Sequence, residues 1–227
     1  MARPIEFDRS SARDRALVLF WDKGYQATSL ADLLDAMNIG RSSFYAAFSD
    51  KRSLYIECLD TFAARTQEVL NEARIRMAPL DALQDFFERN FIGRRVARGK
   101  LGCMLVNTVL EMSGVDDELS ARASRHLGDM EGLFAACFRD AGIEETGARE
   151  MAAVLMVINE GIRVASRRQI APEEQLKGIR ATFRLLRQSL QSTPCLARTG
   201  PLHHDRLFRP SRQDDYRRRF CDPGAHA

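Results

Sequence analysis

Residues 28–51 read TSLADLLDAMNIGRSSFYAAFSDK, and the local signals in this segment predict the type of fold. Apolar residues at positions 30, 33, 34 and 37 follow the i, i+3, i+4, i+7 spacing of a helix. Ser29 can cap that helix, and Asp32 stands at capping-box distance from it. Asn38 follows at a tight turn, where it tolerates a positive φ better than other non-glycine residues do. A second short helix from Arg41 completes the pattern, which predicts a helix-turn-helix.

A helix-turn-helix places the exposed N-terminal side of its second helix in the major groove of double-stranded DNA. Short polar and cationic side chains there can contact base edges or phosphates, and a lysine at the start of the next helix can neutralise another phosphate. We therefore predict DNA contacts from Thr28, Ser29, Arg41, Ser42, Ser43, Tyr45 and Lys51. The alternative is a small helical core in which these polar residues are incidental.

The rest of the chain also has helical periodicity, and no segment has the alternation of a strand. We predict an all-α fold: a three-helix DNA-binding domain over residues 1–55 and a helical effector-binding and dimerisation domain over residues 56–191. Residues 192–227 hold four of the seven prolines and no apolar stripe. They are expected to be a basic, mostly disordered tail.

Composition restricts the functional classes further. Of 227 residues, 45% are hydrophobic and 29% charged, and no stretch is long and apolar enough to span a membrane. Five scattered cysteines without a CxxC pair favour a reducing cytoplasm. The net charge of +3 lies in the tail, so a DNA-binding prediction depends on local pattern. HExxH, GxSxG and Walker motifs are absent, which argues against an enzyme, and no cofactor is expected.

Residues 9–60 resemble the TetR family of bacterial transcriptional regulators. The resemblance lies in the segment from Leu19 to Ser29, the turn at residues 38–40, the aromatic run from Phe44 to Phe48, and Lys51. Asn38 and Gly40 replace the usual turn glycine and serine, and Ala47 replaces a frequent histidine. These departures could shift DNA contacts to Arg52 or to Arg3 in an N-terminal arm.

The resemblance implies a homodimer in which a small-molecule effector releases the protein from DNA. Helices over about 146–168 and 172–190 would pair across the two-fold axis, and residues 80–140 would enclose the effector pocket. Residues 102–111 resemble a Gly-Cys-x-x-x-Asn-Thr-x-x-Glu motif of an AcrR-like branch. Cys103, Asn107 and Glu111 share one helix face, and a second apolar stripe carries His126 and Met130. These five are the predicted effector contacts.

One alternative is a helical interaction protein that senses a metal or an oxidant. Cys103 or Cys137 together with His126 could bind copper or zinc, or a thiol could be oxidised. Both ideas require the side chains to converge, whereas cysteines on apolar stripes are usually inert core residues. We therefore predict no metal site and a TetR-type repressor.

Overall fold

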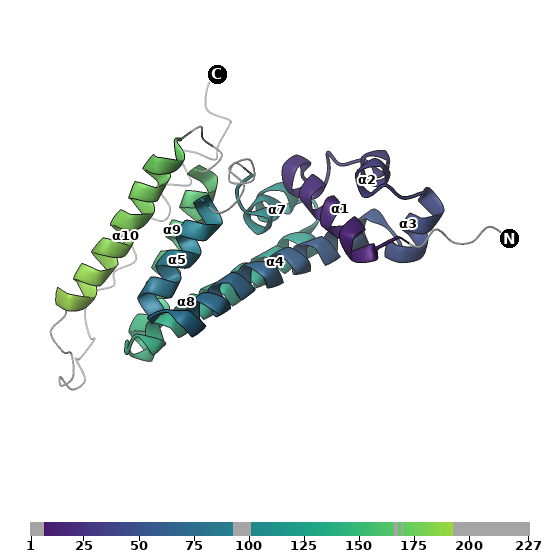
Figure 1. Cartoon of the computed structure of the whole chain (residues 1–227). Helices are drawn as coiled ribbons and strands as arrows, with labels where there is room; N and C mark the ends of the chain where they lie inside the picture. The colour runs from purple at the N-terminus through teal and green to yellow at the C-terminus, as the bar shows by residue number, and fades with distance from the viewer. Residues whose placement is uncertain (1–6, 93–100, 166–167, 169, 193–227) are drawn as a thin grey trace, which may run out of the picture. The chain divides into compact units, whose positions relative to one another are not determined.

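The computed structural model describes residues 7–92, 101–165, 168 and 170–192, and these residues form nine α-helices and no strand (Figure 1). Residues 1–187 form one compact unit and residues 188–227 a second one. The prediction of an all-α fold is confirmed, and the tail predicted over residues 192–227 lies outside the described residues except for Ser192, the last residue of α10. The helices are α1 (Arg9–Lys23), α2 (Leu30–Met37), α3 (Arg41–Phe48), α4 (Lys51–Arg76), α5 (Pro79–Ile92), α7 (Met104–Met112), α8 (Asp117–Asp140), α9 (Glu145–Ala165) and α10 (Pro172–Ser192).

Local signals in the sequence set the bounds of α2 and α3. The Ser29 hydroxyl accepts the Asp32 N–H while the Asp32 carboxylate accepts the Ser29 N–H, which is the predicted capping box. Asn38 ends α2 in the left-handed conformation, with φ 54° and ψ 50°. Gly40 is the N-cap of α3, so this helix begins at Arg41. The predicted capping box, the turn at Asn38 and the second short helix from Arg41 are therefore all confirmed.

Aromatic side chains hold α3 against α1 and α4. Phe44 and Phe48 are 0% and 2% exposed, and both belong to one core with Phe20 of α1 and Tyr55 of α4. Burying a side chain of this size stabilises a fold by roughly 1.5–3 kcal/mol. The polar face of α3 is therefore held in a fixed orientation by the apolar face behind it.

Helix α4 connects the two halves of the larger unit. Its first part, through Ala63, belongs to the core shared with α1, α2 and α3, whereas Leu70 belongs to the core formed with α5, α8, α9 and α10. The domain boundary predicted at 55/56 falls inside this continuous helix. A displacement of α4 would therefore act on both cores.

In the part of the chain that the structure describes, no helix combines the length and the apolar character that crossing a membrane requires.

Candidate nucleic-acid interface and adjoining cavity

The N-terminal side of α3 presents polar side chains to solvent. Arg41 and Ser42 are exposed, Ser43 is half-buried, and Tyr45 is 48% exposed. The Tyr45 ring packs edge-on against the buried Phe44, with ring centroids 5.4 Å apart. This packing orients the ring and leaves its hydroxyl available to a partner. The arrangement matches the geometry that major-groove recognition requires.

The N-terminal side of α2 presents fewer side-chain groups for DNA contacts than the sequence predicts. Ser29 is exposed, but its hydroxyl already bonds to Asp32. Thr28 is 0% exposed, and its hydroxyl donates to the Gly24 carbonyl over 2.6 Å. This corrects the expectation for Thr28: its side chain has no surface for DNA and instead holds the turn before α2. Arg3 lies outside the described residues.

Two cationic residues at the start of α4 differ in their surroundings. Lys51 is half-buried, with its ammonium nitrogen 4.3 Å from the centre of the Tyr25 ring, and burial lowers the pKa of Lys51. Arg52 bonds to Asp116 over 3.1 Å and to Glu118 over 2.6 Å. The Arg52 guanidinium therefore joins α4 to the start of α8, and a DNA contact from Arg52 stays a prediction.

Two arginines of α1 hold the helix-turn-helix in place and were missed by sequence reasoning. Arg9 donates to the Ala47 carbonyl at 3.1 Å and pairs with Glu57 at 2.7 Å. Arg15 donates to the Met37 carbonyl at 2.7 Å. These bonds satisfy carbonyls at the C-terminal ends of α3 and α2, where helices leave acceptors unpaired.

A carboxylate of α7 holds the connection between α1 and α2. Glu111 accepts the Tyr25 N–H over 3.0 Å and the Gln26 N–H over 2.8 Å. Gly24 beside it has φ 85°, and a Cβ at this position would lie 2.8 Å from a Glu111 carboxylate oxygen. The positive φ and the close approach both require glycine here. The sequence contained Glu111 as a candidate, but not this role.

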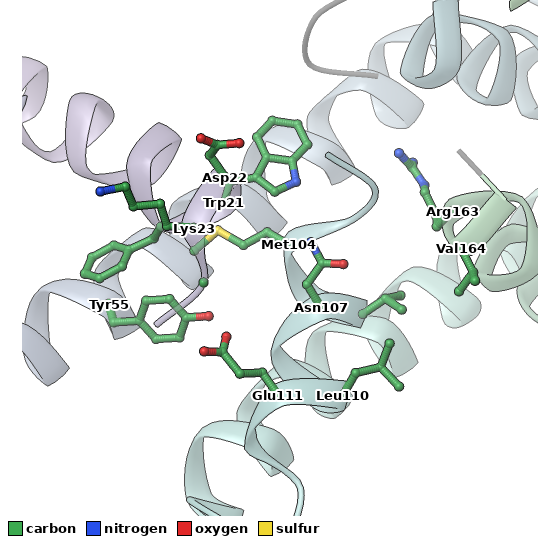
Figure 2. Close-up of a pocket in the computed structure, with 13 residues that line it drawn as sticks. Trp21, Asp22, Lys23, Tyr55, Met104, Asn107, Leu110, Glu111, Arg163 and Val164 are labelled. Carbon is green, nitrogen blue, oxygen red and sulfur yellow. The ribbon is translucent and has the colours of Figure 1, made fainter. Parts of the chain in front are cut away.

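The Glu111 carboxylate also lines a cavity of about 350 Å³ (Figure 2). The C-terminal ends of α1 and α9 form part of its wall, and residues of α4 and α7 form the rest. Its position differs from the predicted pocket over residues 80–140, since α1 and α9 also form its wall. Its lining residues are Phe20, Trp21, Asp22, Lys23, Gly24, Tyr55, Met104, Val106, Asn107, Leu110, Glu111, Arg163 and Val164. Sequence reasoning missed Trp21 and Arg163 among them.

The predicted effector contacts separate into two groups. Asn107 and Glu111 line the cavity, so their role as effector contacts stays a prediction. Cys103 is 5% exposed at the N-cap of α7 and is not among the lining residues. Met130 is 4% exposed and packs in the core with Phe134, so the structure corrects the expectation that it contacts an effector.

His126 also has a different role from the predicted one. Its Nε2 atom lies 2.8 Å from Asp60 Oδ1, and Arg122 contacts the other carboxylate oxygen, Oδ2, at 2.6 Å. The histidine therefore joins α8 to α4 and does not line the cavity. Its place on the apolar stripe of α8 brings it to the edge of the core, where the Asp60 carboxylate faces it.

The Asp60 cluster predicts an acid-dependent loss of stability. Burial raises the pKa of Asp60, but hydrogen bonds from Arg122 and His126 outweigh it and hold the pKa below the usual 3.8. A lowered pKa in the folded state means that the stabilisation is complete above pH 3.8 and lost as the pH falls through the folded value. We expect urea titrations to show a difference between wild type and Asp60→Asn that shrinks below that pH. A difference that stays constant into acid would contradict this assignment.

The structure gives the metal- or thiol-sensing alternative no support. Within the described ranges, no group of three or more His, Cys, Asp and Glu side chains could hold a metal ion. The three cysteines in the described ranges are buried: Cys58, Cys103 and Cys137. Burial raises the pKa of the Cys58 thiol, and it raises the pKa of Cys137 to about 11. A raised pKa disfavours the thiolate, which is the form that binds metals and reacts with oxidants.

Comparisons with known proteins agree with this geometry. Residues 13–58 match the family model of the tetR family of bacterial regulatory proteins, and residues 79–192 match that of the C-terminal domain of LmrA/YxaF-like transcriptional regulators. The transcriptional repressor ComR of Escherichia coli K12 is 29% identical over 191 residues, which cover 81% of this chain and 90% of ComR.

Solved structures share the fold. A TetR regulator from Legionella pneumophila has a TM-score of 0.71 at 17% identity and covers 81% of this chain and 99% of its own. A cysteine mutant of the TetR-family regulator CifR, complexed with 26-bp double-strand operator DNA, has a TM-score of 0.66 at 27% identity. That match covers 80% of this chain and 98% of the CifR chain.

Proposed function

We propose, because the chain belongs to the TetR family of bacterial transcriptional regulators, that it is a repressor released from a palindromic operator by a small-molecule effector. A DNA-binding regulator of this family is not an enzyme. ComR is described as a repressor, and CifR is seen on operator DNA. The proposed site of action is the cytoplasm, where the operator lies.

The observation that carries this proposal is the exposed polar face of α3. Arg41, Ser42 and Tyr45 share that face, and the buried Phe44 and Phe48 fix it from behind. We propose that α3 enters the major groove and that Ser43 and Lys51 approach the phosphates on either side. Ser29 remains a proposed backbone contact at the start of α2.

An apolar stripe on α9 supports the proposed homodimer. Val154, Val157 and Val164 are 56%, 69% and 52% exposed, and Gly161 lies between them at a spacing of three or four residues. Leu185 of α10 is 62% exposed. Exposed apolar residues in such a row indicate a protein–protein contact, and two helices from each subunit can form a four-helix bundle.

Replacing Val157 with Asp is expected to break this dimer. A symmetric interface would place two unpaired carboxylates in an apolar contact, which costs at least about 3 kcal/mol, or roughly a hundredfold in the dimer dissociation constant. Analytical ultracentrifugation over a dilution series measures the constant. Ile75→Asp is the matched control, since Ile75 is 85% exposed on α4. Equal dissociation constants for the two variants would exclude α9 as the interface.

In the proposed dimer the two α3 helices lie about 34 Å apart, which matches successive major grooves. The effector would occupy the cavity beside Asn107 and Glu111 and favour a dimer with a different spacing. We also propose that the chain belongs to an AcrR-like branch, on the motif formed by Gly102, Cys103, Asn107, Thr108 and Glu111.

The test is a titration of duplex DNA from the promoter next to the coding region. We expect tight binding whose affinity falls steeply with salt, and much weaker binding to a scrambled duplex of the same length and composition. Equal affinity for both duplexes at physiological salt would overturn the proposal. Metal uptake without any DNA binding would favour the sensing alternative.

A further inference from the structure

Helix α9 forms one end of the cavity, and its buried Arg163 side chain carries a positive charge there. Arg163 is 7% exposed and lines the cavity, and Figure 2 shows its guanidinium group directed toward the side that Trp21 forms. Burial lowers the pKa of Arg163, because desolvation disfavours the charged form. An anion beside a buried guanidinium would offset that cost. Since a guanidinium group has five N–H donors, it can hold contacts within the protein and bind an anion as well.

Two neutral hydrogen-bond donors line the same cavity. The indole N–H of Trp21 is buried and makes no hydrogen bond with any described residue. Asn107 donates to the Leu101 carbonyl over 2.9 Å, and its amide nitrogen has a second N–H. A buried donor without an acceptor costs free energy, so a ligand oxygen at this position would stabilise the complex.

The two carboxylates of the lining, Asp22 and Glu111, lie away from Arg163 (Figure 2). Both Glu111 oxygens accept backbone N–H groups, and Figure 2 shows Glu111 beside Tyr55, away from Arg163. Asp22 is exposed at the rim. Lys23 is exposed too and pairs with Asp32 over 3.2 Å. Within the described lining, the α9 end of the cavity therefore carries the Arg163 guanidinium and no carboxylate.

We propose that the effector is a small organic carboxylate with an apolar or aromatic body. Its carboxylate accepts hydrogen bonds from Arg163, Trp21 and Asn107, in the planar geometry that a guanidinium group favours. Its apolar body lies along Met104, Leu110 and Val164, and the cavity of about 350 Å³ is large enough for one ring and a short chain. This inference rests on the proposed function, in which this cavity takes the effector.

The test uses benzoate, phenylacetate and 3-phenylpropionate, each beside its primary amide, with the full-length protein without DNA. Trp21 is the single tryptophan of the chain, so its fluorescence reports binding at this cavity. We expect at least one carboxylate to change the fluorescence saturably at millimolar concentration, and its amide to bind at least about tenfold more weakly. Equal binding of acid and amide, or no binding of any carboxylate, would overturn the ligand class.

Two variants test whether Arg163 and Trp21 are the residues that recognise the carboxylate group. Arg163→Gln is expected to remove the preference for carboxylate over amide, whereas Arg125→Gln, at an exposed position of α8, keeps it. Trp21→Phe, which deletes the indole N–H, should weaken carboxylate binding roughly tenfold by calorimetry, and it serves as the second test if Arg163→Gln does not fold. A preference that survives both changes would overturn the assignment.

A parallel operator titration separates the two proposals. Operator binding without carboxylate binding would overturn the ligand class and leave the repressor proposal standing. Carboxylate binding without operator binding would overturn the repressor proposal and leave the ligand class standing.

Discussion

Arg41→Ala is expected to reduce operator affinity more than any other single change on α3. A side chain that bonds to a base edge contributes about 1–3 kcal/mol, and the proposed dimer carries the change twice, so the loss is roughly 2–6 kcal/mol. Arg41 is exposed at the first position of α3, where a recognition helix meets the groove. Fluorescence anisotropy with a labelled operator duplex measures the loss.

The salt dependence of the same titration tells which part of DNA Arg41 contacts. Loss of a base contact lowers the ratio of operator to scrambled-duplex affinity and leaves the salt slope almost unchanged. Loss of a phosphate contact weakens binding to both duplexes and lowers the slope by about one per contact. Arg125→Ala is the matched control, because Arg125 is equally an exposed arginine but lies on α8. An Arg41→Ala protein that binds like this control would remove α3 from the interface.

The helix-turn-helix could be predicted because its determinants are close in sequence. The Ser29–Asp32 capping box spans three residues, and Asn38 determines the turn through its own backbone conformation. The apolar spacing around these residues then determines which face of each helix is buried. For the same reason the exposed face of α3, with Arg41 and Ser42, could be predicted before any contact was known.

The cavity could not be predicted, because its lining is assembled from α1, α4, α7 and α9. Nothing in the sequence around Trp21 or Arg163 shows that these two side chains line the same cavity. His126 was misassigned for a related reason. The periodicity of α8 places it on the stripe that faces the core, but only the packing of α4 shows that Asp60 lies opposite it. The role of Glu111 depends on the same kind of distant contact.

Glu111→Gln is expected to weaken operator binding from a position outside the DNA interface. An amide has one acceptor oxygen, so the change breaks at least one of the two bonds to the Tyr25 and Gln26 N–H groups and turns a donor toward the other. A hydrogen bond to a charged group contributes about 1.5–3 kcal/mol. Faster hydrogen exchange at these two amides, measured by NMR, would show that the connection between α1 and α2 has loosened.

The effect reaches DNA because α2 and α3 follow directly from that connection. A loosened connection leaves the α3 face less fixed, and we expect operator affinity to fall by roughly 5- to 150-fold, the range of a typical coupling between sites. Glu144→Gln is the matched control, because Glu144 also accepts two backbone N–H groups, from Thr146 and Gly147. The Glu144 bonds hold the start of α9, so their loss should leave operator affinity unchanged.

Since Glu111 lines the cavity as well, Glu111→Gln should also reduce the factor by which a bound ligand lowers operator affinity. Thermodynamic linkage requires an equal reduction in the factor by which the operator lowers ligand affinity. A factor that stays at its wild-type value in Glu111→Gln would mean that Glu111 does not connect the two sites.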